Sequence, residues 1–173
     1  MRKLLNILAL SVLAGSFASA QDATSQLKAA AKTGKTTFVL FHASWCGWCH
    51  KLEDFMATKE IKPIMDKHFT TLWWDVMEQG DKKSLETPGA AEYMKTWKAT
   101  SAGLPWGIML DRKGKAIGNM FKDGVKDNTG YPASADEIAT FMKLLAKGAP
   151  KMTAAEKSTI ENALVEAGKK INH

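Results

Sequence analysis

The two cysteines of this 173-residue chain stand two residues apart, in the segment WCGWCH at residues 45–50. Because the chain has no third cysteine, Cys46 and Cys49 act as a pair with each other or with a bound group. Three kinds of chemistry use such a pair. They are a redox dithiol that cycles to a disulfide, part of a metal site, and, since His50 follows directly, the CxxCH motif that attaches c-type haem.

The first twenty residues have the pattern of a secretory signal peptide. Arg2 and Lys3 give a positive start, an apolar run follows over residues 4–13, and an A-x-A cleavage site ends at Ala20. The apolar run is too short to cross a membrane. We therefore expect cleavage after Ala20 and a mature protein of residues 21–173 in the periplasm or outside the cell, with no membrane span.

The mature chain has the length of one domain with its own core. In an oxidising compartment disulfides persist, but a loop closed by residues two apart is too small to brace a fold. A functional disulfide is therefore the leading explanation for the cysteines. Loss of the signal peptide lowers the formal net charge from +6 to +4, and the lysines are spread along the chain without interleaved aromatics, so we expect no nucleic-acid partner.

The rest of the pattern predicts a single α/β domain. The run at residues 36–43 is apolar and β-branched almost throughout, which indicates a strand buried on both faces. Residues 77–88 are polar and are expected to form a loop. We expect strands at 36–43, 69–76, 106–110 and 115–120, and helices at 23–32, 47–56, 59–67, 90–98, 134–147 and about 153–170. This order predicts a mixed sheet of about four strands with helices on both faces and an extra C-terminal helix.

A buried strand followed by Trp-Cys-x-x-Cys at the start of a helix, and later by Pro105 before a hairpin, resembles the thioredoxin superfamily. The resemblance covers about residues 23–147. The segment from Cys46 to Glu53 is most similar to exported thioredoxin-like proteins and to the periplasmic domains of Dsb-type reductases. It implies a thioredoxin fold and thiol-disulfide exchange with protein substrates.

The resemblance also implies a role for each residue of the site. Cys46 is the attacking cysteine, Cys49 the resolving one, and Pro105 a cis-proline that faces them, while Trp45, Leu104 and Pro105 bind the substrate backbone. The physical chemistry agrees for Cys46, because the N-terminus of a helix favours the thiolate, which is the attacking species. Trp48 and Trp45 flank this helix end, where they are expected to form an apolar rim for a peptide.

Thioredoxins usually carry a buried acid six residues before the first cysteine, and this chain has Leu40 there. Glu53, one turn past Cys49, and His42, on the preceding strand, are the candidates to replace it as proton acceptor. A surface glutamate and a strand histidine with ordinary partners are the alternatives. His50, four residues after Cys46, is a further candidate for tuning the thiol pKa.

We thus expect an exported thiol-disulfide oxidoreductase with no cofactor and no resident metal, a reductant rather than an oxidant, because no histidine lies between the cysteines. A reductant in that compartment needs electrons from a membrane redox partner. Two alternatives stay open. One is a copper-delivery protein of thioredoxin fold that uses Cys46, Cys49 and His42 or His50, and the other is c-type haem attachment.

Overall fold

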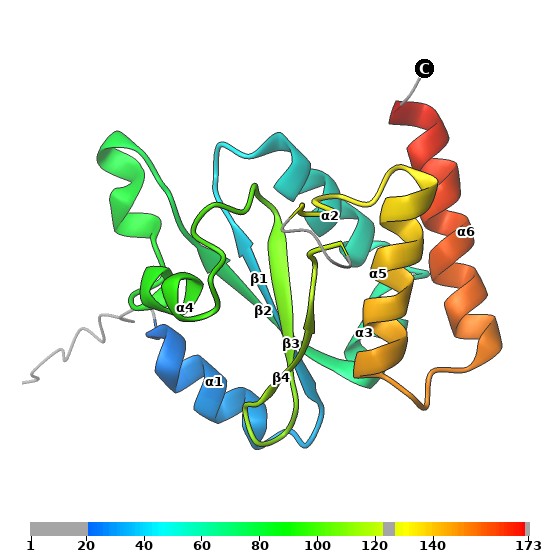
Figure 1. The fold of residues 1–173 in the computed structure, drawn as a ribbon, viewed down its shortest axis with the longest axis horizontal. Helices are drawn as coiled ribbons and strands as arrows, with labels where there is room; N and C mark the ends of the chain where they lie inside the picture. Colours follow the sequence, from blue (N-terminus) through cyan, green and yellow to red (C-terminus); the bar gives the residue numbers. More distant parts are fainter. Residues whose placement is uncertain (1–20, 123–126, 172–173) are drawn as a thin grey trace, which may run out of the picture.

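A computed structural model describes residues 21–122 and 127–171, and its centre is a four-stranded mixed sheet (Figure 1). The strand order is β2-β1-β3-β4, with β2 parallel to β1 and the remaining pairs antiparallel. The strands are β1 Thr36–His42, β2 Phe69–Asp75, β3 Trp106–Leu110 and β4 Ala116–Asn119. This is the predicted thioredoxin-like sheet. The predicted signal peptide, residues 1–20, lies outside the described residues.

Helices fill the positions that the sequence pattern indicated. They are α1 Ala23–Ala31, α2 Gly47–Ala57, α3 Lys62–His68, α4 Ala90–Thr96, α5 Ala135–Gly148 and α6 Ala154–Ile171. Two details differ from expectation. The helix expected from residue 59 begins at Lys62, with Pro63 in its first turn, where a missing N–H costs little. The expected loop at 77–88 contains a 3-10 helix, η1 Gly80–Leu85.

The two faces of the sheet are covered by different helices. Alternate residues of β1 point to opposite faces. On one face, Phe41 packs against Trp74 of β2, which stacks on Trp97 next to α4. The indole N–H of Trp74 donates to Gln26 of α1. Phe38 belongs to the other face and packs on Phe141 of α5. The same face carries His42, which reaches α2.

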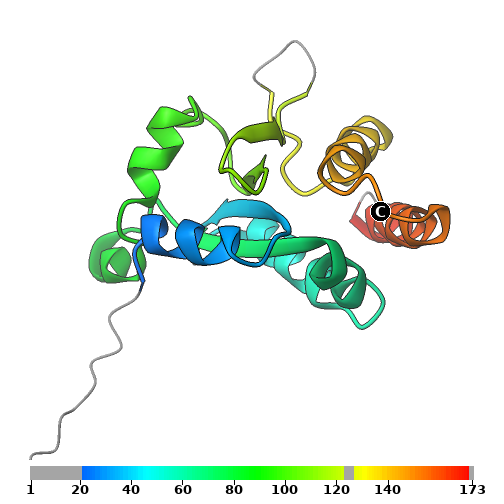
Figure 2. The same cartoon turned by 90° about the horizontal axis from the view of Figure 1, so that it is seen from below.

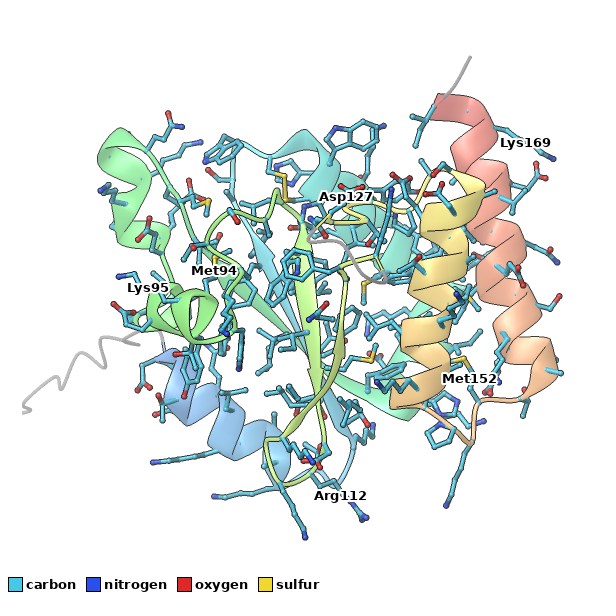
Figure 3. The ribbon with its side chains drawn as sticks, in the orientation of Figure 1. Met94, Lys95, Arg112, Asp127, Met152 and Lys169 are labelled. Atoms are coloured by element: carbon cyan, nitrogen blue, oxygen red, sulfur yellow. A yellow bond between two sulfur atoms is a disulfide. The ribbon has the colours of Figure 1, made fainter. Side chains whose placement is uncertain are left out.

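The C-terminal helices form a pair at one side of the molecule. Figures 1 and 2 show α6 side by side with α5, and Ile160 and Leu164 on the inner face of α6 are fully buried. Both N-termini have the capping boxes expected from sequence, in which a glutamate three residues on accepts from the N-cap backbone. Figure 3 shows Lys169 on the outer side of α6, and Arg112 in the β3–β4 turn at the lower end of the sheet in that view. Among the described residues, no helix is both long and apolar enough to cross a membrane.

Candidate active site

Cys46 and Cys49 form a disulfide at the N-terminal end of α2. Cys46 is the N-cap residue, and its Sγ accepts a hydrogen bond of 3.2 Å from the backbone N–H of Cys49. Its side chain keeps a small exposed fraction, 5%, whereas Cys49 is fully buried. Once the disulfide is reduced, the same N–H and the helix N-terminus favour a thiolate on Cys46. Cys46, predicted to attack first, is thus the more accessible of the two, and the order of attack stays a prediction.

The loop before β3 lies against the disulfide. The Leu104–Pro105 peptide bond is cis, as the family resemblance implied, and Leu104 packs against Ala43 and both cysteines. Asn128, which lies far along the chain, holds this loop in place. Its Nδ2 donates to the carbonyl oxygens of Gly103 at 2.6 Å and of Pro105 at 2.8 Å. Of the predicted substrate-binding residues, Leu104 is thus held against the cysteines, and Pro105 is the next residue of the same loop.

Two exposed tryptophans flank the disulfide. Trp45 and Trp48 have 51% and 47% of their surface accessible. The Trp45 indole N–H donates to the carbonyl of Met77 at 2.8 Å, so this ring leans on the loop after β2. Trp48 turns to the other side and stacks on Tyr131, with ring centroids 6.2 Å apart. The two rings therefore extend the apolar surface in two directions, and peptide binding by Trp45 stays a prediction.

A polar cluster occupies the α2 face of β1 where the family has its buried acid. Leu40 is fully buried, and His42 is the next residue of β1 on the same face. Its Nδ1–H donates to Glu53 Oε1 at 2.5 Å, and its Nε2 lies 3.5 Å from Asp75 Oδ1. Burial raises the pKa of Asp75 above its usual value, an effect that the positive charge of His42 opposes. The structure thus brings together the two predicted substitutes, His42 and Glu53, and adds Asp75.

A cavity of about 520 Å³ opens onto this polar cluster from the side of α2 and α3. His42 and Glu53 lie in its wall, together with Lys62 and Asp66 of α3. The cavity gives the His42–Glu53 pair a route to solvent that does not pass the cysteines. A proton taken up at this pair has a path out of the protein.

His50 binds Ser44 and Glu53, and neither of these hydrogen bonds is to a cysteine. Its Nε2–H donates to the Ser44 carbonyl at 3.0 Å, and its Nδ1 lies 3.4 Å from Glu53 Oε2. The hydrogen bond to Ser44 is the main reason that the pKa of His50 is raised. Both ring nitrogens are engaged by protein acceptors, which disfavours the axial ligation that haem attachment requires. Within the described residues, no three His, Cys, Asp or Glu side chains are arranged to hold a metal.

Sequence reasoning missed Glu78, which lies in the segment expected to be a loop. Its side chain is 3% exposed. Its two carboxylate oxygens accept from the Ser44 backbone N–H at 2.5 Å and from the Ser44 hydroxyl at 2.8 Å. The first of these bonds is the main cause that lowers the pKa of Glu78. Glu78 therefore anchors the turn that leads into Cys46. No local sequence pattern indicates this role, because the contact joins positions 34 residues apart.

A family model described as thioredoxin-like matches residues 18–110. A disulphide isomerase from Xylella fastidiosa Temecula1 is 19% identical in sequence over 95% of this chain and 100% of its own, with a TM-score of 0.47. A DsbH oxidoreductase is 20% identical over 94% of each chain, with a TM-score of 0.47.

A thioredoxin-fold protein from Helicobacter pylori is 14% identical over 80% of this chain and 87% of its own, with a TM-score of 0.44. No curated protein matches the sequence. The family model spans more than half of the chain, including β1, the cysteine pair and β3. The chain belongs to the thioredoxin-like family.

Proposed function

We propose that this protein is an exported thiol-disulfide oxidoreductase that reduces disulfides in protein substrates. The observation that carries the proposal is the Cys46–Cys49 disulfide at the N-terminus of α2, packed against Leu104 of the cis-proline loop. A disulfide in that position is the oxidised form of a pair whose reduced form is activated by the helix. Haem attachment and copper delivery gain no comparable support.

The reaction follows from the two sulfurs. In the reduced protein the Cys46 thiolate attacks one sulfur of a substrate disulfide, the substrate S–S bond breaks, and one substrate thiolate leaves. The Cys49 thiolate then attacks Cys46 Sγ, releases the second substrate thiolate and forms the Cys46–Cys49 disulfide. The substrate gains two electrons and two protons, and the protein loses them.

The proton of Cys49 needs an acceptor for this second step. His42 and Glu53 form the hydrogen-bonded pair on the α2 face of β1, and Glu53 lies one helical turn beyond Cys49. We assign them the part that a buried acid plays in thioredoxins. The pair accepts the proton of Cys49 and does not act as a nucleophile. The cavity of about 520 Å³ connects the pair to solvent.

Export and an electron donor complete the proposal. The signal-like residues 1–20 would deliver the protein to the periplasm or outside the cell, where a membrane redox partner would return electrons to the disulfide. The mass of the exported protein tests the first part, because cleavage after Ala20 leaves a chain that begins at Gln21.

The test of the activity is trapping. A Cys49→Ala variant is expected to accumulate mixed disulfides between Cys46 and substrate proteins, because the resolving thiol is missing, and Cys46→Ala is the matched control that traps none. Equal trapping by both variants, or by neither, contradicts the mechanism. The reduction potential of the pair then sets the direction. A value of about −270 mV indicates a reductase, and a value of about −120 mV indicates an oxidant.

A further inference from the structure

A groove of about 700 Å³ separates α2 from the C-terminal helix α6. Its lining residues on α2 are three or four positions apart, as in Lys51, Asp54 and Phe55, so they share one face of the helix. The lining residues of α6, from Thr159 to Ile171, share one face in the same way. The floor is apolar and includes Phe55, Ile61 and Ala163. Charged residues of both signs stand at the rim, including Lys51 and Glu166. Such a surface favours an uncharged, apolar occupant over one of a particular charge.

The groove is continuous with the aromatic rim of the disulfide. Tyr131 lines the groove, packs edge-on against Phe55, and stacks with the ring of Trp48. Lys51 also lines the groove, and its Nζ lies 5.8 Å from the centre of the Trp48 ring. A chain that leaves the cysteines over Trp48 therefore meets the groove next.

The far wall of the groove is held rigidly. α6 approaches the segment after Tyr131 so closely that a Cβ on Gly168 would lie 2.4 Å from the backbone oxygen of Ala133. At the other end, Glu156 bonds to Lys67 at 2.7 Å and to His68 at 3.1 Å, which ties α6 to α3. The C-terminal end of α6, at Ile171, lies at the same end of the molecule as the start of α2 (Figure 1). The groove thus exists before anything binds, which lowers the entropic cost of binding.

We propose that this groove is a second docking site for the disulfide substrate, which takes an extended, apolar segment of the substrate polypeptide next to its reacting cysteine. The inference rests on the proposed function for the identity of the occupant. The lining from Thr159 to Ile171 covers about 18 Å of helix, at ~1.5 Å per residue. At ~3.3 Å per residue of extended chain, about five substrate residues fill it.

The experiment compares two substitutions on neighbouring exposed positions of α6. Asn162→Trp places an indole in the groove, and Glu161→Trp places the same side chain outside it, since Glu161 is not part of the lining. Ala163→Glu, which puts a carboxylate on the apolar floor, is a second way to close the site. The substrates are peptides that carry one cysteine in a mixed disulfide with glutathione, followed by five residues that are either leucine and phenylalanine or serine. Glutathione disulfide is the small substrate.

The native protein is expected to reduce the apolar peptide at least about tenfold more efficiently (kcat/KM) than the serine peptide. Asn162→Trp and Ala163→Glu should remove that advantage through KM, while Glu161→Trp keeps it and all variants reduce glutathione disulfide equally. Equal rates on both peptides in the native protein overturn the inference. The inference also fails if Asn162→Trp lowers kcat/KM for glutathione disulfide as much as for the apolar peptide. The substitution would then act on the reaction as a whole and not on docking of the peptide.

Binding without chemistry separates this inference from the proposed function. A cysteine-free apolar peptide is titrated into the oxidised protein by calorimetry, and its affinity is expected to fall at least about tenfold in Asn162→Trp and in Ala163→Glu but not in Glu161→Trp. If the protein reduces no disulfide but still binds the peptide in this way, the proposed function fails and the docking surface stands. If no peptide binds, the inference fails. Self-association that Asn162→Trp abolishes would assign the groove to a second copy of the chain, which also overturns it.

Discussion

The two faces of the central sheet are built by different means. On the α1 and α4 face, Phe41, Trp74 and Trp97 pack ring against ring, and the one polar atom of the Trp74 indole bonds to Gln26. On the α2 face, His42 lies between two carboxylates and borders a cavity. The first face is closed by apolar contacts, and the second keeps charged groups partly buried.

This difference separates stability from chemistry. Close packing of aromatic rings contributes burial free energy and leaves nothing to titrate. Burying a carboxylate costs free energy that the fold must supply from elsewhere. We infer that the aromatic face supplies the stability with which the α2 face holds Asp75 and Glu53 partly buried. Four substitutions test which parts of the molecule contribute stability and which contribute to the reaction, beginning with the largest expected effect.

Truncation of a ring on the aromatic face should have the largest effect on stability. Trp74 is fully buried, and Trp74→Ala is expected to lower the free energy of unfolding by about 3–5 kcal/mol, the cost of a large-to-small change in a core. Urea denaturation measures it. The reduction potential of the cysteine pair in the folded variant should not change, because the ring does not contact the disulfide.

Trp73 is the matched control, because it is the neighbouring residue on the opposite face and is only partly buried. Trp73→Ala should cost less than half as much as Trp74→Ala. Equal losses in the two variants would show that the two faces contribute equally to stability. The aromatic face would then not be the main source of the protein's stability.

Removal of Glu78 should affect the reaction more than the fold. Glu78→Ala leaves the Ser44 N–H and hydroxyl without their acceptors, so the turn into Cys46 loosens. We expect disulfide exchange to slow by roughly ten- to hundredfold, the range for a reacting group displaced by up to 1 Å. Stability should fall less than in Trp74→Ala. Stopped-flow kinetics with a small disulfide measures the rate, and Glu161→Ala, an exposed position on α6, is the control.

Features with a local sequence signal could be predicted, and contacts between distant segments could not. The strand at Trp106–Leu110 and both capping boxes were predicted because their signals lie within a few residues. The cis-proline and the cysteine order came with the family resemblance. The Ser44–Glu78 contact could not be predicted, because it depends on the meeting of two distant loops. His42 and Glu53 were candidates by spacing alone, and only the packing of α2 on β1 brings them into contact.

A carboxylate with good partners should stabilise the protein as pH rises. Lys67 is the first cause that lowers the pKa of Glu156 from 4.5 to about 2. The folded protein therefore holds this proton less tightly than the unfolded chain. Its contribution to stability is present above pH 4.5 and is lost as the pH falls toward 2. Glu156→Gln should thus be less stable than the native protein at pH 7, and the two should converge near pH 2. A gap of constant size between pH 7 and pH 2 would show that the charge is not responsible.

The polar cluster should show a smaller effect of opposite sign. Burial raises the pKa of Asp75 above 3.8, so the folded protein binds this proton more tightly than the unfolded chain. Its stability contribution is therefore full below pH 3.8 and is lost as the pH rises through the folded-state pKa. Asp75→Asn removes that loss, and the variant should gain stability relative to the native protein between pH 3 and pH 7. Urea midpoints at the two pH values measure the difference.

If Asp75→Asn instead loses stability at pH 7 relative to pH 3, the attraction between Asp75 and His42 outweighs the cost of burial. The polar cluster would then stabilise the fold like the Glu156 ion pair, and the α2 face would need no support from the aromatic one. A double-mutant cycle decides between the two, in which Asp75→Asn is made with and without His42→Gln, so that the lost bond between His42 and Glu53 cancels. With burial dominant, Asp75→Asn gives a similar gain in stability between pH 3 and pH 7 in both backgrounds. With the attraction dominant, Asp75→Asn loses stability at pH 7 only while His42 is present.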